Sequence, residues 1–247
     1  MDDLSISATG RRSWRLLLVL TALGLAGVAS LLLMPLEALL PAGVEVPRAL
    51  LLVQPAVFVV AFSLLGWWAA PKLGLDAPVL GRLVEGGDWL GTLRHALPLA
   101  LAGGVVSAGV LIVYGLATAG TFVDQAPAVE LPMASRLLYG GVAEEIMLRW
   151  GLLSLIALAA LKSRMTLPGA LWTGNLVAAL LFALGHLPAL FALIPDPPTW
   201  LLGAVLLANA SAGIVFGWLY IRRGLEAAMI GHALAHLLAV PLLTLIG

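Results

Sequence analysis

Two carboxylates and a guanidinium lie together in the middle of a long apolar stretch, in the sequence EEIMLR at residues 144–149. Ionisable groups at membrane depth are costly, so they usually face a protein interior or a wet cavity and indicate a functional site. Glu145 and Arg149 are four residues apart on one helical face, with the acid first, which predicts an ion pair. Glu144 lacks such a partner, because apolar residues occupy the following turn. We therefore expect Glu144 to act as a general base; the alternative is a buried salt-bridge network without catalysis.

Three histidines in two other apolar stretches offer further polar groups at membrane depth. Phe182 and His186 are four residues apart, so the phenyl ring is expected to pack beneath the imidazole. His232 and His236 have the same spacing and share one face of the last apolar stretch. Such a pair is typical of zinc sites, and His186 with a glutamate could complete the ligands. Alternatively, the pair donates hydrogen bonds to a developing oxyanion.

Composition indicates the environment in which these groups must work. The chain has 247 residues, of which 62% are hydrophobic and 11% are charged, whereas soluble domains carry about 25% charged residues. This predicts an all-α, polytopic transmembrane bundle. The formal net charge is zero and there is no cysteine. These facts exclude a basic field for nucleic acid, disulfides, thiolate nucleophiles and Cys-ligated metal.

Membrane-spanning helices need about 20 apolar residues, and seven stretches of the chain meet this requirement. They cover residues 16–34, 49–70, 97–119, 137–161, 170–193, 200–221 and 225–246. An eighth membrane-associated segment could lie within 71–98, where a short interfacial helix is predicted at 83–93, or within 121–133. We expect a cytoplasmic tail at residues 1–15 and a transmembrane domain at residues 16–247.

Basic residues alternate between successive loops, and this alternation predicts the orientation of the chain. It places the N-terminus in the cytoplasm and the C-terminus outside, in a multi-pass protein of the cell membrane. The first stretch resembles a signal peptide, but it is long enough to span the membrane, and we expect it to be retained. At about 1.5 Å per residue, Glu144, His186 and His236 all lie near the midplane, which predicts a single site.

Smaller residues in the same stretches are expected to join the helices. Asn175 and Asn209 are predicted to form hydrogen bonds between helices. Gly140 and Gly141 are predicted to allow close helix packing, and Gly185 is predicted to let another backbone approach. These expectations concern the packing around the site rather than its chemistry.

The three motifs, taken together and in this order, resemble those of the CAAX prenyl protease and bacteriocin-processing family, also called the CPBP or Abi family. Its pattern is Glu-Glu-x-x-x-Arg, then Phe-x-x-x-His, then His-x-x-x-Asn or Asp, each on a separate membrane helix. The first two motifs are present unchanged at residues 144–149 and 182–186. The third departs from the pattern, because His236 stands where Asn or Asp is expected. The resemblance covers residues 137–238, which would form the protease core.

This resemblance implies an all-helical intramembrane endopeptidase that acts on a membrane-associated peptide or protein, prenylated or not. Glu144 and His186 would activate the attacking water, and His232 with His236 would stabilise the oxyanion. The remaining motif residues, Glu145, Arg149 and Phe182, would support the site structurally. The implied partners are the lipid bilayer and the substrate, with no nucleic acid.

The resemblance implies a glutamate mechanism without a cofactor. A histidine at position 236 is a better zinc ligand than asparagine, so a zinc peptidase remains an alternative, with His186, His232, His236 and Glu144 as ligands. A non-catalytic immunity or scaffold protein of the same fold is a second alternative. A proton-coupled transporter is a third, although the sequence shows no internal repeat.

Overall fold

The computed structural model describes residues 13–40, 44, 46–125 and 131–246. Regular structure within these ranges is entirely helical. The elements are α1 (Trp14–Ala29), η1 (Ser30–Leu33), η2 (Leu36–Leu39), α2 (Arg48–Leu51), α3 (Val53–Ala69), η3 (Ala70–Leu73), α4 (Pro78–Glu85), α5 (Trp89–Gln125), α6 (Met133–Ser135), η4 (Arg136–Glu144), η5 (Ile146–Leu153), α7 (Ser154–Lys162), α8 (Leu167–Gly185), α9 (Leu187–Leu193), α10 (Thr199–Arg223) and α11 (Leu225–Ile246).

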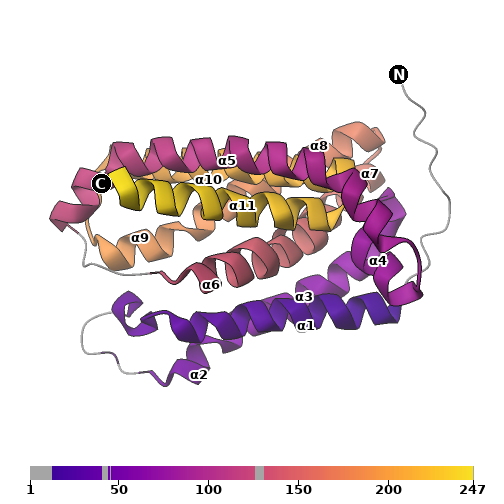
Figure 1. Cartoon of the computed structure of the whole chain (residues 1–247), viewed down its shortest axis with the longest axis horizontal. Coiled ribbons are helices and arrows are strands. Elements are labelled where there is room, and N and C mark those ends of the chain that lie inside the picture. Colours follow the sequence, from indigo (N-terminus) through magenta and orange to yellow (C-terminus); the bar gives the residue numbers. More distant parts are fainter. Residues whose placement is uncertain (1–12, 41–43, 45, 126–130, 247) are drawn as a thin grey trace.

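The long helices run along one axis and form a bundle (Figure 1). Six helices among the described residues are long and apolar enough to cross a membrane: Trp14–Leu33, Arg48–Leu73, Trp89–Phe122, Leu167–Leu193, Thr199–Arg223 and Leu225–Ile246. They correspond to six of the seven predicted stretches. The remaining stretch, 137–161, is helical as well, but it carries three charged residues near its middle. The prediction of a polytopic helical membrane protein is confirmed. The tail predicted at residues 1–15 lies mostly outside the described residues, because only positions from 13 onward are described.

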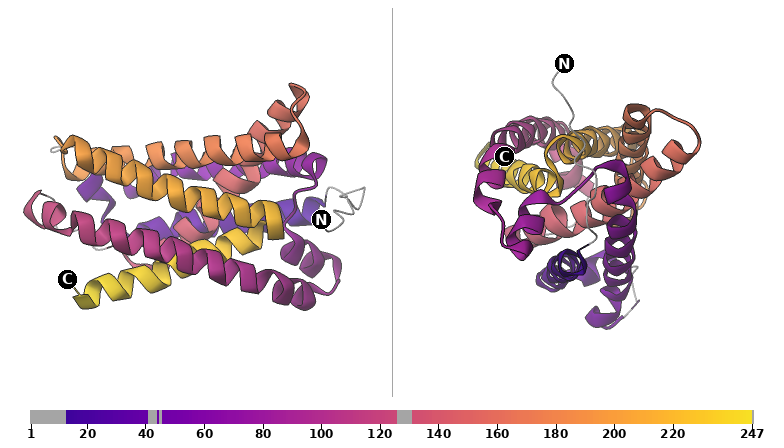
Figure 2. Two further views of the ribbon diagram at one scale, coloured as in Figure 1. Left: turned by 90° about the horizontal axis from the view of Figure 1, so that it is seen from above. Right: turned by 90° about the vertical axis from the view of Figure 1, so that its right-hand side faces the viewer.

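The run from α6 to α7 occupies the middle of the bundle, between α1 and α3 on one side and α5, α10 and α11 on the other (Figures 1 and 2). Its central elements, η4 and η5, are wound as π-helix, a form that is rare and often accompanies functional sites. Close packing holds this run in place, with η4 against α1 and α11 and η5 against α3 and α8. A Cβ added at Gly27 of α1 would overlap the Leu138 carbonyl of η4, so the absence of a side chain there allows this approach.

Residues 83–93 are divided between two helices, α4 and α5, so the single helix predicted there is wrong. Gly86 ends α4 with a positive φ of 77°, a conformation that favours glycine. The Asp88 carboxylate then accepts a hydrogen bond from the Gly91 backbone N–H at 2.8 Å and so caps the start of α5. Across the bundle, the Glu226 carboxylate accepts from the Leu80 N–H at 2.7 Å, which attaches α4 to the start of α11. The polar segment at 71–98 holds no eighth spanning helix among its described residues.

The two ends of the bundle differ in their number of basic residues. The end with α4 carries the basic residues Lys72, Arg82, Arg94, Lys162, Arg164, Arg222 and Arg223. The opposite end, with α2 and α9, carries Arg48 and Arg136 among the described residues. The predicted orientation, with the basic end in the cytoplasm, stays a prediction.

Candidate active site

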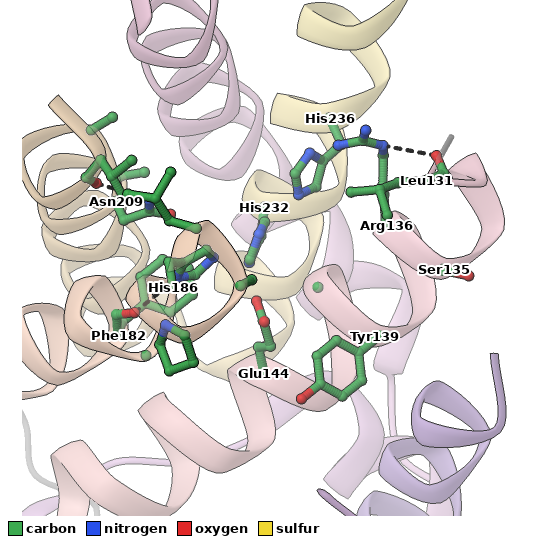
Figure 3. A pocket seen from close by; sticks show the side chains of 18 of the residues that line it. Leu131, Ser135, Arg136, Tyr139, Glu144, Phe182, His186, Asn209, His232 and His236 are labelled. Carbon is green, nitrogen blue, oxygen red and sulfur yellow. Dashed lines mark hydrogen bonds between the residues drawn. The ribbon is translucent and has the colours of Figure 1, made fainter. Parts of the chain in front are cut away.

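A cavity of about 1120 Å³ lies within the bundle and is bounded by α3, α5, η4, η5, α8, α9, α10 and α11. Glu144, His186, His232 and His236 all line it. They come from three different parts of the chain, and Figure 3 shows them around one space. The structure therefore brings the four predicted site residues together, as their similar depths along the helices suggested.

Glu144 reaches this cavity from the last residue of η4, and its side chain points toward the space between His186 and His232 (Figure 3). It is partly exposed. No other residue in the described part of the chain forms a hydrogen bond or ion pair with its carboxylate. A carboxylate without a partner on a cavity wall is available to accept a proton from a bound water.

Glu145, one residue later, has the opposite environment. It is fully buried, and its Oε1 lies 3.0 Å from Nη1 of Arg149, so the predicted ion pair is confirmed. The same oxygen lies 2.8 Å from Nδ1 of His232, a contact across 87 positions that spacing along one helix could not predict. Glu145 therefore joins the arginine to one of the site histidines.

The Arg149 guanidinium is held on several sides. Its Nη2 donates to the Gly213 carbonyl at 3.0 Å, and its Cζ lies 5.1 Å from the ring centre of Phe182 and 5.4 Å from that of Phe216. Contacts of this kind between a cation and aromatic faces are attractive. The His232 ring stacks on Phe216 at a centroid distance of 4.4 Å. Arg149 and the two phenylalanines thus support the site from behind.

His186 is held in one tautomer by its hydrogen bond. Its Nδ1 lies 2.8 Å from the Phe182 carbonyl oxygen, and a carbonyl can only accept, so Nδ1 carries the proton and Nε2 is left as an acceptor. The Phe182 and His186 rings are in contact at 4.6 Å but lie nearly perpendicular, at 86°. The predicted ring contact is confirmed. The prediction for Gly185 is wrong, because a Cβ there would meet nothing within 4 Å; Gly185 lines the cavity instead.

The rings of His232 and His236 lie 5.1 Å apart, and both direct Nε2 toward Gly140. A Cβ added at Gly140 would lie 3.5 Å from Nε2 of His232 and 3.4 Å from that of His236. The predicted role of Gly140 in helix packing is therefore wrong. Its neighbour Gly141 has that role, because a Cβ there would lie 3.1 Å from Cβ of Ala233 on α11.

The two histidines differ in how their second nitrogen is used. Nδ1 of His232 donates to Glu145, so a neutral His232 presents only a lone pair at Nε2 and must become an imidazolium to donate there. Nδ1 of His236 is buried and has no partner among the described residues. A neutral His236 can therefore carry its proton on Nε2 and donate toward Gly140.

The zinc alternative requires several ligands around one point. Among the described residues, no group of three or more His, Asp or Glu side chains is placed to hold a metal ion. The donor set His186, His232, His236 and Glu144 lines one cavity without forming such a group. The mechanism without a cofactor and the zinc alternative both stay predictions.

The cavity also contains polar residues that were not predicted as part of the site. Arg136 and Tyr139 line it from η4, and Asn209 lines it from α10 (Figure 3). The hydrogen bond predicted for Asn209 is wrong, since its Nδ2 donates to Val205 of its own helix at 2.9 Å. Asn175 behaves as predicted and donates to the Ile214 carbonyl of α10 at 3.1 Å. The position of Arg136 on the cavity wall could have been predicted, because a residue eight positions before Glu144 lies near the same helical face.

These features define a polytopic membrane protein whose helices enclose a cavity lined by a glutamate and three histidines. The model of the family described as Type II CAAX prenyl endopeptidase Rce1-like matches residues 128–238. This segment contains all four predicted site residues, and the match confirms the resemblance predicted from the motifs. In general terms the family indicates a membrane protease, an intramembrane endopeptidase of the CAAX type. No curated protein and no solved structure matches the chain.

Proposed function

We propose that this protein hydrolyses a peptide bond in a membrane-associated peptide or protein, and that Glu144 activates the attacking water. The observation that supports this assignment is the contrast between the two adjacent glutamates. Glu145 is occupied by Arg149 and His232, whereas Glu144 faces the cavity without a partner among the described residues. A general base must be both within reach and free to take a proton.

The proton steps follow from these environments. A water beside Glu144 gives one proton to the carboxylate as its oxygen attacks the scissile carbonyl carbon. Nε2 of His186 accepts a hydrogen bond from the O–H that stays on the water, because Nδ1 is engaged with the Phe182 carbonyl. When the carbon–nitrogen bond breaks, Glu144 returns its proton to the leaving amine nitrogen.

The oxyanion is stabilised by donors that lie over Gly140. His236 can donate from Nε2 as a neutral ring, because nothing described binds its Nδ1. His232 donates from Nε2 only as an imidazolium, because its Nδ1 already donates to Glu145. The histidine that replaces the family's Asn or Asp is thus a suitable donor, and we assign it the larger share of oxyanion stabilisation.

The test is the variant Glu144→Gln, which keeps the shape of the side chain and removes the base. Wild type and variant are compared in proteoliposomes with lipid-anchored reporter peptides and by peptidomics of whole membranes. We expect cleavage to fall by about 100-fold or more, since general base catalysis contributes 10²–10⁴. Undiminished cleavage would refute the glutamate mechanism.

Two controls separate the alternatives. Glu85→Gln alters an exposed glutamate of α4, far from the cavity, and should leave cleavage unchanged. Metal analysis of the purified protein, with and without a chelator, tests the zinc alternative; stoichiometric zinc lost together with activity would favour it. A cellular phenotype that survives Glu144→Gln would instead favour a non-catalytic immunity or scaffold role.

A further inference from the structure

Arg136 shares the cavity-lining face of η4 with the candidate base. Arg136, Gly140 and Glu144 follow one another at intervals of four residues, and all three line the cavity. Figure 3 shows Arg136 beside His236, on the opposite side of the cavity from His186. Gly140 lies between Arg136 and Glu144 and faces the Nε2 atoms of His232 and His236, so a chain that runs from the cation to the base passes both histidines.

The charge of Arg136 is not neutralised by another described residue. Its Nε donates to the Leu131 carbonyl at 3.1 Å, and no acidic group in the described part of the chain forms an ion pair with it. Two other described arginines differ, because Arg149 pairs with Glu145 and Arg48 pairs with Glu37. The two terminal nitrogens of Arg136 can therefore bind an anion that enters the cavity.

The chemistry of a peptide substrate limits what that anion can be. A guanidinium binds a carboxylate through two parallel hydrogen bonds, and every peptide with a free C-terminus ends in a carboxylate. Eight helical residues span at most about 12 Å, and an extended peptide covers about 3.3–3.6 Å per residue. A chain held at Arg136 would therefore present to Glu144 a bond roughly two to four residues from its end.

We propose that Arg136 binds the free C-terminal carboxylate of the substrate and so determines which peptide bond lies at Glu144. This inference rests on the proposed peptidase function. It assigns a specificity-determining residue outside the three sequence motifs. The enzyme then removes a short C-terminal fragment whose length is set by the spacing of Arg136 and Glu144 along η4.

The experiment compares three lipid-anchored peptides that differ only at the C-terminus: a free acid, the corresponding amide, and the free acid extended by five residues. Each is tested with wild type, Arg136→Gln, Arg136→Lys and, as the matched control, Arg94→Gln, which changes an exposed arginine at the other end of the bundle. Thermal unfolding of each variant shows whether it is folded. Mass spectrometry gives the length of the released fragment.

We expect amidation to lower kcat/KM of the wild type by roughly 10- to 100-fold, the range for a lost hydrogen bond to a charged group, mainly through KM. With Arg136→Gln the free acid should fall to the level of the amide, and amidation should have no further effect. Arg136→Lys should recover part of the difference, and Arg94→Gln should behave as wild type. In the extended peptide the cut should move with the new end.

Three results would overturn the assignment. The first is equal cleavage of acid and amide by the wild type. The second is a uniform loss on both substrates in Arg136→Gln, which indicates a structural role. The third is a wild-type rate that changes with the anionic lipid content of the vesicles and is unaffected by amidation. That result would show that Arg136 binds a lipid phosphate. If the wild type cleaves none of the peptides, the proposed function itself fails, and that outcome is distinct from these three.

Discussion

Adding one methyl group at Gly140 should separate the chemistry of the site from the stability of the fold. A Cβ at this position would lie 3.4–3.5 Å from Nε2 of both His232 and His236, which is ordinary contact and requires no movement. Gly→Ala at a compatible helical position usually stabilises a protein by about 0.4–1 kcal/mol. We therefore expect Gly140→Ala to fold at least as well as the wild type.

The same methyl group would occupy the space that the proposed oxyanion needs. Donors must lie about 2.7–3.1 Å from the oxyanion, and the methyl group stands directly beside both Nε2 atoms. Removing one oxyanion donor typically costs about 10²–10³ in kcat. We expect Gly140→Ala to lose activity by a similar factor, measured with a lipid-anchored reporter peptide in proteoliposomes, while its thermal unfolding temperature is unchanged or higher.

Gly109→Ala is the matched control, because it makes the same substitution in α5 at an exposed position where a Cβ would meet nothing within 4 Å. It should reproduce any gain in stability and keep full activity. If Gly140→Ala cleaves the reporter as fast as the control, the two histidines do not act over Gly140, and the assignment of the oxyanion site is wrong. If it fails to fold, the packing described around η4 is wrong.

Two further predictions concern the supporting structure. Arg149→Leu leaves the buried Glu145 carboxylate without its main counter-charge and should destabilise the protein by roughly 3–5 kcal/mol, seen as a lower midpoint in thermal or denaturant unfolding; an unchanged midpoint would contradict the ion pair. In Gly217→Ala the new Cβ would overlap the Asn175 side chain, which should cost about 1–3 kcal/mol by the same measurement. The double variant with Asn175→Ala should recover part of that loss, whereas strictly additive losses would show that the two residues are not in contact.

Much of the architecture follows from local properties of the chain. Apolar stretches of membrane length predict helices regardless of what they pack against, and the six described spanning helices agree with this. The pairing of Glu145 with Arg149 was predictable for the same reason, because four residues along a helix return to the same face. The hydrogen bond of Asn175 was predictable because a polar side chain in an apolar helix needs a partner. The ring contact of Phe182 with His186 was predictable because the two residues are four positions apart. The helix boundaries around Gly86 were missed, although the glycine with a positive φ and the capping Asp88 both belong to the sequence between the two helices.

Contacts between helices required the tertiary structure, because spacing along one helix determines its own faces but not its rotation against a neighbour. The amino-acid sequence placed two adjacent glutamates in an apolar helix and offered an arginine to one of them. Only the fold brings His232 to the same carboxylate, directs both Nε2 atoms over Gly140 and adds Arg136 to the wall of the cavity. The difference between a supporting glutamate and an available one therefore depends on how α11 packs against η4, an interaction that neither helix specifies alone.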